Sequence, residues 1–169
     1  QKVPGFANLT FAVFNESYRV VFEAMPLQSV SKTALSEFSP GGGTALFDAM
    51  AMTIQNTQRR LDAMPEATRP GRVVILVMTD GQESGSSREF KLAQVVEMVK
   101  AAEARQWNVL FTGAGLDAMS QGQALGVQVA NSVGYVPDAQ GTRAAYSVVS
   151  SNLRSYRNSD AVMSQNFWE

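Results

Sequence analysis

The sequence VVILVMTDG at residues 73–81 decides the fold class. It begins with a continuous apolar run and stops at a polar turn, which is typical of a strand buried on both faces of a parallel sheet. Parallel strands are joined by long crossovers that are usually helical. We therefore expect helices on both sides of this stretch.

Helices and further strands are predicted around this strand. A mostly apolar stripe at steps of three and four from Leu46 to Met64 predicts a long helix that ends before Pro65. Apolar residues at helical spacing also occur at 30–35, before a glycine loop. Further helices are predicted at 90–102, 117–125 and 144–156. Strands are expected at 107–111 and 127–129, and an antiparallel hairpin at 9–14 and 18–24.

This alternation predicts one α/β domain over residues 1–157, followed by a tail over residues 158–169. We expect a mostly parallel sheet with helices on both faces and the antiparallel hairpin at one edge. Ligands of such sheets bind at the carboxyl ends of the strands. The loops after Pro40, Met78 and Thr112 are therefore the candidate positions for a site.

The composition excludes several classes of function. The 169 residues include 45% hydrophobic and 17% charged side chains, with a net charge of -1, which offers no basic field to nucleic acid or an anionic membrane. The absence of Cys and His excludes disulfides, thiolate nucleophiles and histidine triads. Carboxylate and hydroxyl oxygens remain, and they suit hard cations. We expect neither nucleic acid nor membrane as a partner, and a cytoplasmic location as the default.

The first motif is a glycine loop, GGGTALFDA at residues 41–49, that leads into the long helix. Gly42 and Gly43 allow a tight turn, and Thr44 places a hydroxyl at the start of the helix. This hydroxyl could bind a ligand or simply cap the helix. Asp48 could support the loop or a metal-bound water, or be an ordinary charge in the first turn. The loop lacks the lysine of a P-loop.

The second motif is the end of the central strand, where Asp80 and Gly81 follow the apolar run. An acidic side chain at the end of a buried strand needs hydrogen bonds or a cation. In the polar loop that follows, Glu83 could add an outer oxygen, or the loop could simply be solvated. The later stretch Gly113–Gly115 fits a dinucleotide fingerprint formally, although a plain strand-to-helix turn explains it as well.

The order of hairpin, GGGTALFDA, helix, apolar strand and MTDG resembles the von Willebrand factor A (VWA) domain family, and WNVLFTGAGLDA at residues 107–118 is similar to small standalone bacterial and phage VWA proteins. The resemblance implies a Rossmann-like three-layer sandwich with a metal-ion-dependent adhesion site. It implies that Thr44 and Asp80 hold Mg or Mn, with Gly42, Gly43, Asp48, Gly81 and Glu83 in supporting loops. The implied activity is capture of an acidic group of a protein partner, without catalysis.

The sequence departs from the family at its first motif, because it contains no Asp-x-Ser-x-Ser. The resemblance then implies that this domain is N-terminally incomplete and lacks a central strand between the hairpin and residues 73–78. An upstream segment or another chain would supply that strand, because unpaired backbone groups in an apolar layer are costly. Direct closure of the hairpin onto residues 73–78 is a third arrangement. With only Thr44 and Asp80 as ligands, the chain should bind metal weakly.

Two other functions remain open from the sequence. The chain could be a metal-free assembly module with the same fold. It could also be a phosphate- or nucleotide-processing enzyme that uses Asp80 with a metal and Gly113–Gly115 against phosphate, although neither glycine loop contains Lys or Arg.

Overall fold

The computed structural model describes residues 5–31, 41–115, 117–158 and 167–168. It begins with an antiparallel hairpin of β1 (Asn8–Phe14) and β2 (Tyr18–Pro26). Asn15 closes the turn, since its side-chain oxygen accepts the backbone N–H of Ser17 at 3.0 Å. The predicted hairpin is therefore confirmed, with slightly longer strands.

A parallel sheet follows, in the order β3-β4-β5. Its strands are β3 (Val74–Thr79), β4 (Asn108–Ala114) and β5 (Ser132–Tyr135). Thr79 is level with Gly113, and Gly113 with Gly134, so the carboxyl ends of all three strands meet at one edge. This edge carries the polar loops that the sequence singles out.

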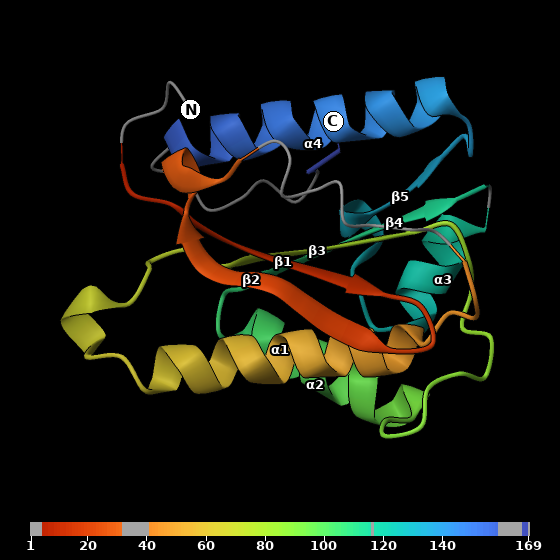
Figure 1. Ribbon diagram of the computed structural model, residues 1–169, viewed down its shortest axis with the longest axis horizontal. Helices are drawn as coiled ribbons and strands as arrows, with labels where there is room; N and C mark the ends of the chain where they lie inside the picture. Colours follow the sequence, from red (N-terminus) through yellow and green to blue (C-terminus); the bar gives the residue numbers. More distant parts are fainter. Residues whose placement is uncertain (1–4, 32–40, 116, 159–166, 169) are drawn as a thin grey trace.

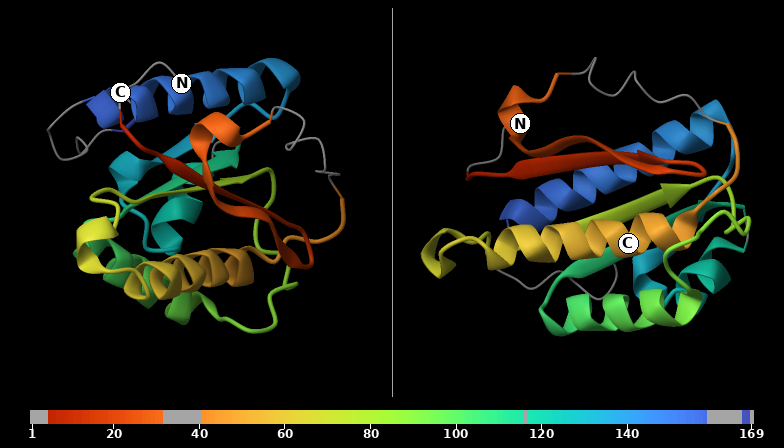
Figure 2. Two further views of the ribbon diagram at one scale, coloured as in Figure 1. Left: turned by 60° about the vertical axis from the view of Figure 1, so that its left-hand side comes forward. Right: turned by 60° about the horizontal axis from the view of Figure 1, so that its bottom comes forward.

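Helices cover the strands from two sides. In Figure 1 and in the left view of Figure 2, α1 (Leu46–Asp62) and α2 (Leu92–Ala104) lie on one side and α4 (Ala139–Asn158) on the other. The short α3 (Ala118–Ala124) packs beside β4 and β5. Single 3-10 turns occupy Leu27–Ser29, Glu66–Thr68 and Val129–Asn131. The chain thus adopts a mixed α/β fold.

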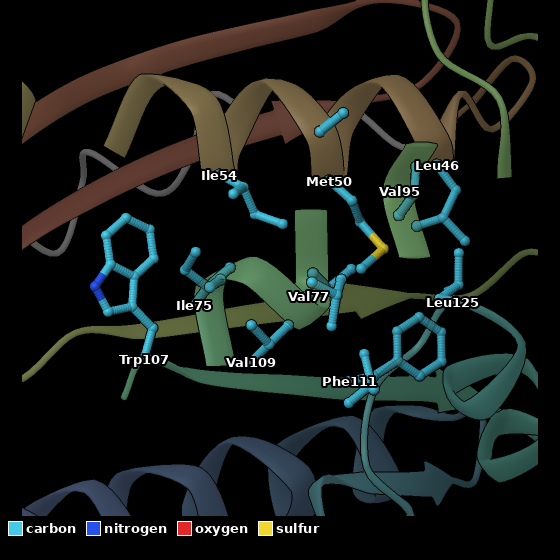
Figure 3. Packing of buried hydrophobic residues seen from close by; sticks show 14 of the residues in the cluster. Leu46, Met50, Ile54, Ile75, Val77, Val95, Trp107, Val109, Phe111 and Leu125 are labelled. Carbon is cyan, nitrogen blue, oxygen red and sulfur yellow. The ribbon is translucent and has the colours of Figure 1, made fainter. Parts of the chain in front are cut away.

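The main core lies between α1, α2 and the parallel sheet. Figure 3 shows Leu46, Met50 and Ile54 of α1 directed at the strands, as their helical spacing predicts. A second apolar cluster on the α4 side contains Leu110, Tyr156 and Phe167, and all of its members are buried. Burial on both faces explains the nearly continuous apolar run of β4, whereas in β3 the alternate residues Val74, Leu76 and Met78 are only partly buried.

The strand predicted at residues 127–129 is wrong. Gly126 adopts a left-handed φ of 85°, and the backbone N–H of Val127 donates to the carbonyl of Gly122 at 2.9 Å. This arrangement ends α3 as a Schellman cap, which uses the apolar residue after the glycine as a packing contact. Val127 is accordingly buried at the helix end, and the strand begins only at Ser132.

The ends of the predicted elements differ in two further places. Residues 32–35 of the helical spacing and the loop up to Pro40 lie outside the described residues, and Val30, which is described, has an extended backbone. Helix α4 begins at Ala139, earlier than predicted, and ends at Asn158. Of the expected tail, Phe167 is buried and Trp168 packs against the second cluster.

The hairpin and the parallel sheet remain two separate sheets in the described part of the chain. Direct closure of the hairpin onto β3 is therefore not the arrangement that forms. None of the described helices is both long enough and apolar enough to cross a lipid bilayer.

Candidate functional site

The two predicted metal ligands flank two elements at the carboxyl edge of the sheet. Thr44 precedes α1 and Asp80 follows β3. The Thr44 hydroxyl lies against Gly81, because a β-carbon placed on Gly81 would stand 2.9 Å from Thr44 Oγ1. The structure thus brings together Thr44 and the Asp80–Gly81 turn, which are far apart in the sequence.

Thr44 does not cap α1. The N-cap residue is Ala45, without a side-chain cap, and the free N–H groups of the first turn are bound by the loop after β3. Glu83 accepts the N–H of Phe47, and the hydroxyl of Ser87 accepts that of Asp48, both at 3.1 Å. The helix therefore does not consume the Thr44 hydroxyl, which forms no hydrogen bond to any described residue.

Asp48 holds the loop after β3 rather than a ligand. Its carboxylate is buried and accepts the backbone N–H groups of Arg88, Glu89 and Phe90 at 2.8 to 3.4 Å. Three donors satisfy a buried carboxylate without a metal. Asp48 therefore supports the loop after β3, not the glycine loop for which the sequence suggested it.

Glu83 is bound in the same way and faces α1. Both carboxylate oxygens accept hydrogen bonds from Ser87, one from its N–H at 3.1 Å and one from its hydroxyl at 2.6 Å. Burial acts to raise the pKa of Glu83, but these bonds and that from Phe47 outweigh it and hold the pKa below its ordinary value. Asp48 and Glu83 therefore form a reciprocal clamp between α1 and the loop.

Gly43 is required by close packing in the glycine loop. A β-carbon there would lie 2.3 Å from Ser86 Oγ and 2.8 Å from Ser84 Oγ. Ser84 Oγ in turn accepts the N–H of Thr44 at 2.7 Å. Gly42 needs glycine for a different reason, namely a left-handed φ of 83°. Ser84 thus fixes the backbone of Thr44, and Ser86 binds the Ser84 hydroxyl at 2.8 Å.

Asp80 is exposed at the end of β3 and forms no hydrogen bond to the described residues. Its charge reaches Tyr135 at the end of β5. The pKa of the Tyr135 phenol is raised mainly by burial and, to a smaller extent, by the negative charge of Asp80. The Tyr135 hydroxyl donates to the Thr79 carbonyl at 3.4 Å. The Asp80 carboxylate is therefore available at the surface.

The structure adds one acidic residue that the sequence did not single out. Glu16, in the turn of the hairpin, accepts the N–H of Gly43 at 3.1 Å, and the carbonyl of Asn15 accepts the N–H of Ala45. The hairpin turn thereby rests on the glycine loop. No local sequence signal indicates this contact, because it depends on how the hairpin packs against α1.

An open cleft of about 390 Å³ lies beside Gly81, between the start of α1 and α3. Its walls are apolar at Leu46, Phe47 and Leu125, with Gln121 and Asp117 at one side. Gln121 donates to the Gly81 carbonyl at 3.4 Å and so connects α3 to the turn after β3. The cleft also includes Gln82 and Glu83, so it adjoins the loop that follows Gly81.

Packing explains Gly113, which lies in β4, and a backbone hydrogen bond holds Gly115, which follows the strand. A β-carbon on Gly113 would lie 3.0 Å from that of Ala118, and the N–H of Gly115 donates to the Tyr135 carbonyl at 2.9 Å. This N–H is directed at the neighbouring strand, not at a bound phosphate. A strand-to-helix turn accounts for both observations.

The donor set fits a hydrated magnesium or manganese ion. Thr44 and Asp80 offer one hydroxyl and one carboxylate, which are hard oxygen ligands, and Mg²⁺ commonly keeps several waters beside one or two carboxylates. No cluster of three or more Asp, Glu, His or Cys side chains occurs among the described residues. Any protein-bound ion here would thus depend mainly on Asp80.

Comparisons with known proteins identify no relative, since no family model, curated protein or solved structure matches this chain.

Proposed function

We propose that this chain is a VWA-type protein interaction module that captures an acidic group of a protein partner through Mg²⁺ or Mn²⁺. Thr44 and Asp80 hold the ion, and waters complete its shell. One observation carries the proposal: the Thr44 hydroxyl, unused by α1, lies against the turn that presents the exposed Asp80. The ion supplies a positive charge that attracts a carboxylate of the partner.

The arrangement around these ligands supports binding rather than catalysis. Ser84 fixes the backbone of Thr44, and the clamp of Asp48 and Glu83 fixes the loop after Asp80. Such hydrogen bonds hold the residues that would bind the ion in place before the ion arrives. The carboxylates of Asp48 and Glu83 accept hydrogen bonds from the backbone and from Ser87, so they are poorly placed to transfer protons in a reaction.

Nuclear magnetic resonance with Mn²⁺ locates the ion directly. Paramagnetic Mn²⁺ added to the ¹⁵N-labelled chain should broaden the amide signals of residues 42–46 and 80–82 first. The Asp80→Asn variant should lose this broadening, whereas Asp117→Asn, which removes an exposed acid beside the cleft, should keep it. Equal broadening in both variants would contradict a site at Asp80.

Capture of a carboxylate is tested with a matched pair of peptides. With Mg²⁺ present, a short peptide that contains a single glutamate should shift the signals near Thr44, and its glutamine counterpart should not. Removal of Mg²⁺ with a chelator should abolish the shift. A shift that persists without Mg²⁺ would show binding of another kind.

A metal-free assembly module is the second candidate. The observation in its favour is that the Asp48 and Glu83 carboxylates already accept hydrogen bonds from the protein. Asp80 is then the carboxylate near Thr44 that could bind an ion. This candidate predicts that Mn²⁺ does not broaden the amide signals of the chain. It also predicts that Mg²⁺ neither shifts these signals nor stabilises the chain. Thermal unfolding with and without Mg²⁺ separates the two candidates, since a ligand of the native state raises the unfolding temperature.

A further inference from the structure

The open cleft beside Gly81 has an apolar lining that water still reaches. Leu46 and Leu125, which lie at the same end of the core in Figure 3, are buried and line the cleft from the core. Leu92, at the start of α2, also lines it and is 40% exposed. A ligand that covers this surface gains hydrophobic stabilisation.

The charge of the cleft is negative. In the described part of the chain, the two ionisable side chains that line it, Glu83 and Asp117, are both acidic. Burial acts against ionisation of Glu83, but its hydrogen bonds keep its pKa below 4.5, so it is charged at neutral pH. Asp117 is exposed at the N-cap of α3 and forms no side-chain cap hydrogen bond there. An acidic cleft with apolar walls attracts a cationic ligand.

Neutral acceptors lie beside these acids. Gln82, Ser120 and Gln121 line the same cleft. The side-chain nitrogen of Gln121 donates to the Gly81 carbonyl at 3.4 Å, so its side-chain oxygen can accept a hydrogen bond from a ligand. A cation with several N–H groups can therefore use more than one acceptor here.

We propose that this cleft binds an arginine side chain of a protein partner. A long cationic side chain fits both features of the cleft, because its methylene stem covers apolar surface while its charged end stays at the rim. The stem then lies along Leu46 and Leu92, and the guanidinium reaches Asp117.

Arginine fits better than lysine or a free amino acid. A guanidinium presents five donors in one plane, which suits a carboxylate next to amide oxygens, and this plane can stack on the ring of Phe47, another residue of the lining. Free arginine carries an α-carboxylate as well. None of the described residues that line the cleft is positively charged, so this carboxylate would meet only Glu83 and Asp117.

The inference rests on the cleft and not on the proposed ion site, so its test is run in the presence of a chelator. The probe is the tripeptide Gly-Arg-Gly, acetylated at its N-terminus and amidated at its C-terminus. Two control peptides replace arginine with citrulline, which has the same shape without the charge, or with a guanidinium on a stem two methylene groups shorter. Binding is followed by nuclear magnetic resonance of the ¹⁵N-labelled full chain.

The arginine peptide should shift the amide signals of Phe47, Gln82 and Gln121. The citrulline peptide should bind at least ~5-fold more weakly, because hydrogen bonds between charged groups are stronger than neutral ones. The short-stem peptide should bind at least ~3-fold more weakly, because it covers less apolar surface.

A matched pair of variants tests the position of the charge. Asp117→Asn should bind the arginine peptide at least ~5-fold more weakly than the parent chain. Glu66→Gln also removes one negative charge, but from an exposed turn beyond the other end of α1, and it should bind as the parent does. Because the peptide binds without a metal ion, loss of the ion-site proposal would leave this inference standing, and the reverse holds as well.

Several results would overturn the inference. Equal affinities for the arginine and citrulline peptides would show that the cleft does not recognise the charge. Equal weakening in Asp117→Asn and Glu66→Gln would assign the preference to the overall charge of the chain. Tighter binding of free arginine, or of a Gly-Lys-Gly peptide blocked in the same way, would assign the cleft to a different ligand.

Discussion

The Thr44 hydroxyl and the α-carbon of Gly81 are close neighbours, although 36 residues of helix, linker and strand separate them in the chain. The distance of 2.9 Å from Oγ1 to the missing β-carbon leaves no room for a methyl group. This contact sets how near the Thr44 hydroxyl lies to the turn that carries Asp80. It also makes Gly81 a sensitive position for testing the proposed ion site.

Gly81→Ala should weaken Mn²⁺ binding with little loss of stability. The new methyl group pushes the Thr44 hydroxyl away from the turn, and a hydroxyl at the tip of a short side chain can move at modest cost. Mn²⁺ titration followed by electron paramagnetic resonance measures the effect. Gly71→Ala is the matched control, because its β-carbon meets nothing within 4 Å. Equal affinities in the two variants would argue against a role for the Thr44 hydroxyl.

Asp48→Asn should destabilise the fold by about 1–3 kcal/mol, because an amide oxygen replaces a charged acceptor and its NH₂ group faces backbone donors. The buried carboxylate binds the N–H groups of Arg88, Glu89 and Phe90. Urea denaturation measures the change, with the exposed Asp117→Asn as control. A loss no greater than in the control would show that the clamp contributes little.

Gly43→Ala should destabilise the chain by about 1–3 kcal/mol through overpacking against Ser84 and Ser86. Ser86→Ala removes the nearer oxygen, which lies 2.3 Å from the new β-carbon. The double variant should therefore recover part of the loss, and a double-mutant cycle in urea measures this coupling. If the stability losses of the two single variants simply add up in the double variant, the strain lies elsewhere in the loop.

The Glu83 carboxylate should make stability depend on pH in the acid range. Its pKa in the folded chain lies below the ordinary value of 4.5, so its contribution is complete above that value and disappears as the pH falls through the folded pKa. Glu83→Gln should thus be less stable than the parent at neutral pH, and the difference should shrink below about pH 5. Urea unfolding at a series of pH values tests this.

The control for this series is Glu89→Gln, an exposed glutamate whose replacement changes the net charge equally. It separates the effect of the lost hydrogen bonds from that of the changed net charge. A difference for Glu83→Gln that stays constant over this pH range would contradict the hydrogen-bonded role of Glu83.

The sequence alone predicts the elements whose periodicity is strong. The apolar spacing of α1 and the continuous run of β3 each have one physical interpretation, and both are confirmed. The meeting of Thr44 with the turn at Gly81 also follows, because loops at the carboxyl ends of parallel strands gather at one edge.

What the sequence does not reveal are contacts set by loop conformation. Thr44 looks like a helix cap, but Glu83 and Ser87 take over this role from a loop about 40 residues later. The strand predicted around Val127 fails because β-branched residues also suit the apolar position of a Schellman cap. In both cases a distant or irregular partner overrides the local preference.

The affinity of the chain for Mn²⁺ is the measurement that tests the proposed function most directly. Electron paramagnetic resonance should be applied to the parent chain, Asp80→Asn and Asp117→Asn under identical conditions. We expect one weak site whose affinity falls at least ~10-fold, about 1.4 kcal/mol, in Asp80→Asn and is unchanged in Asp117→Asn. Identical Mn²⁺ binding by all three proteins would contradict it.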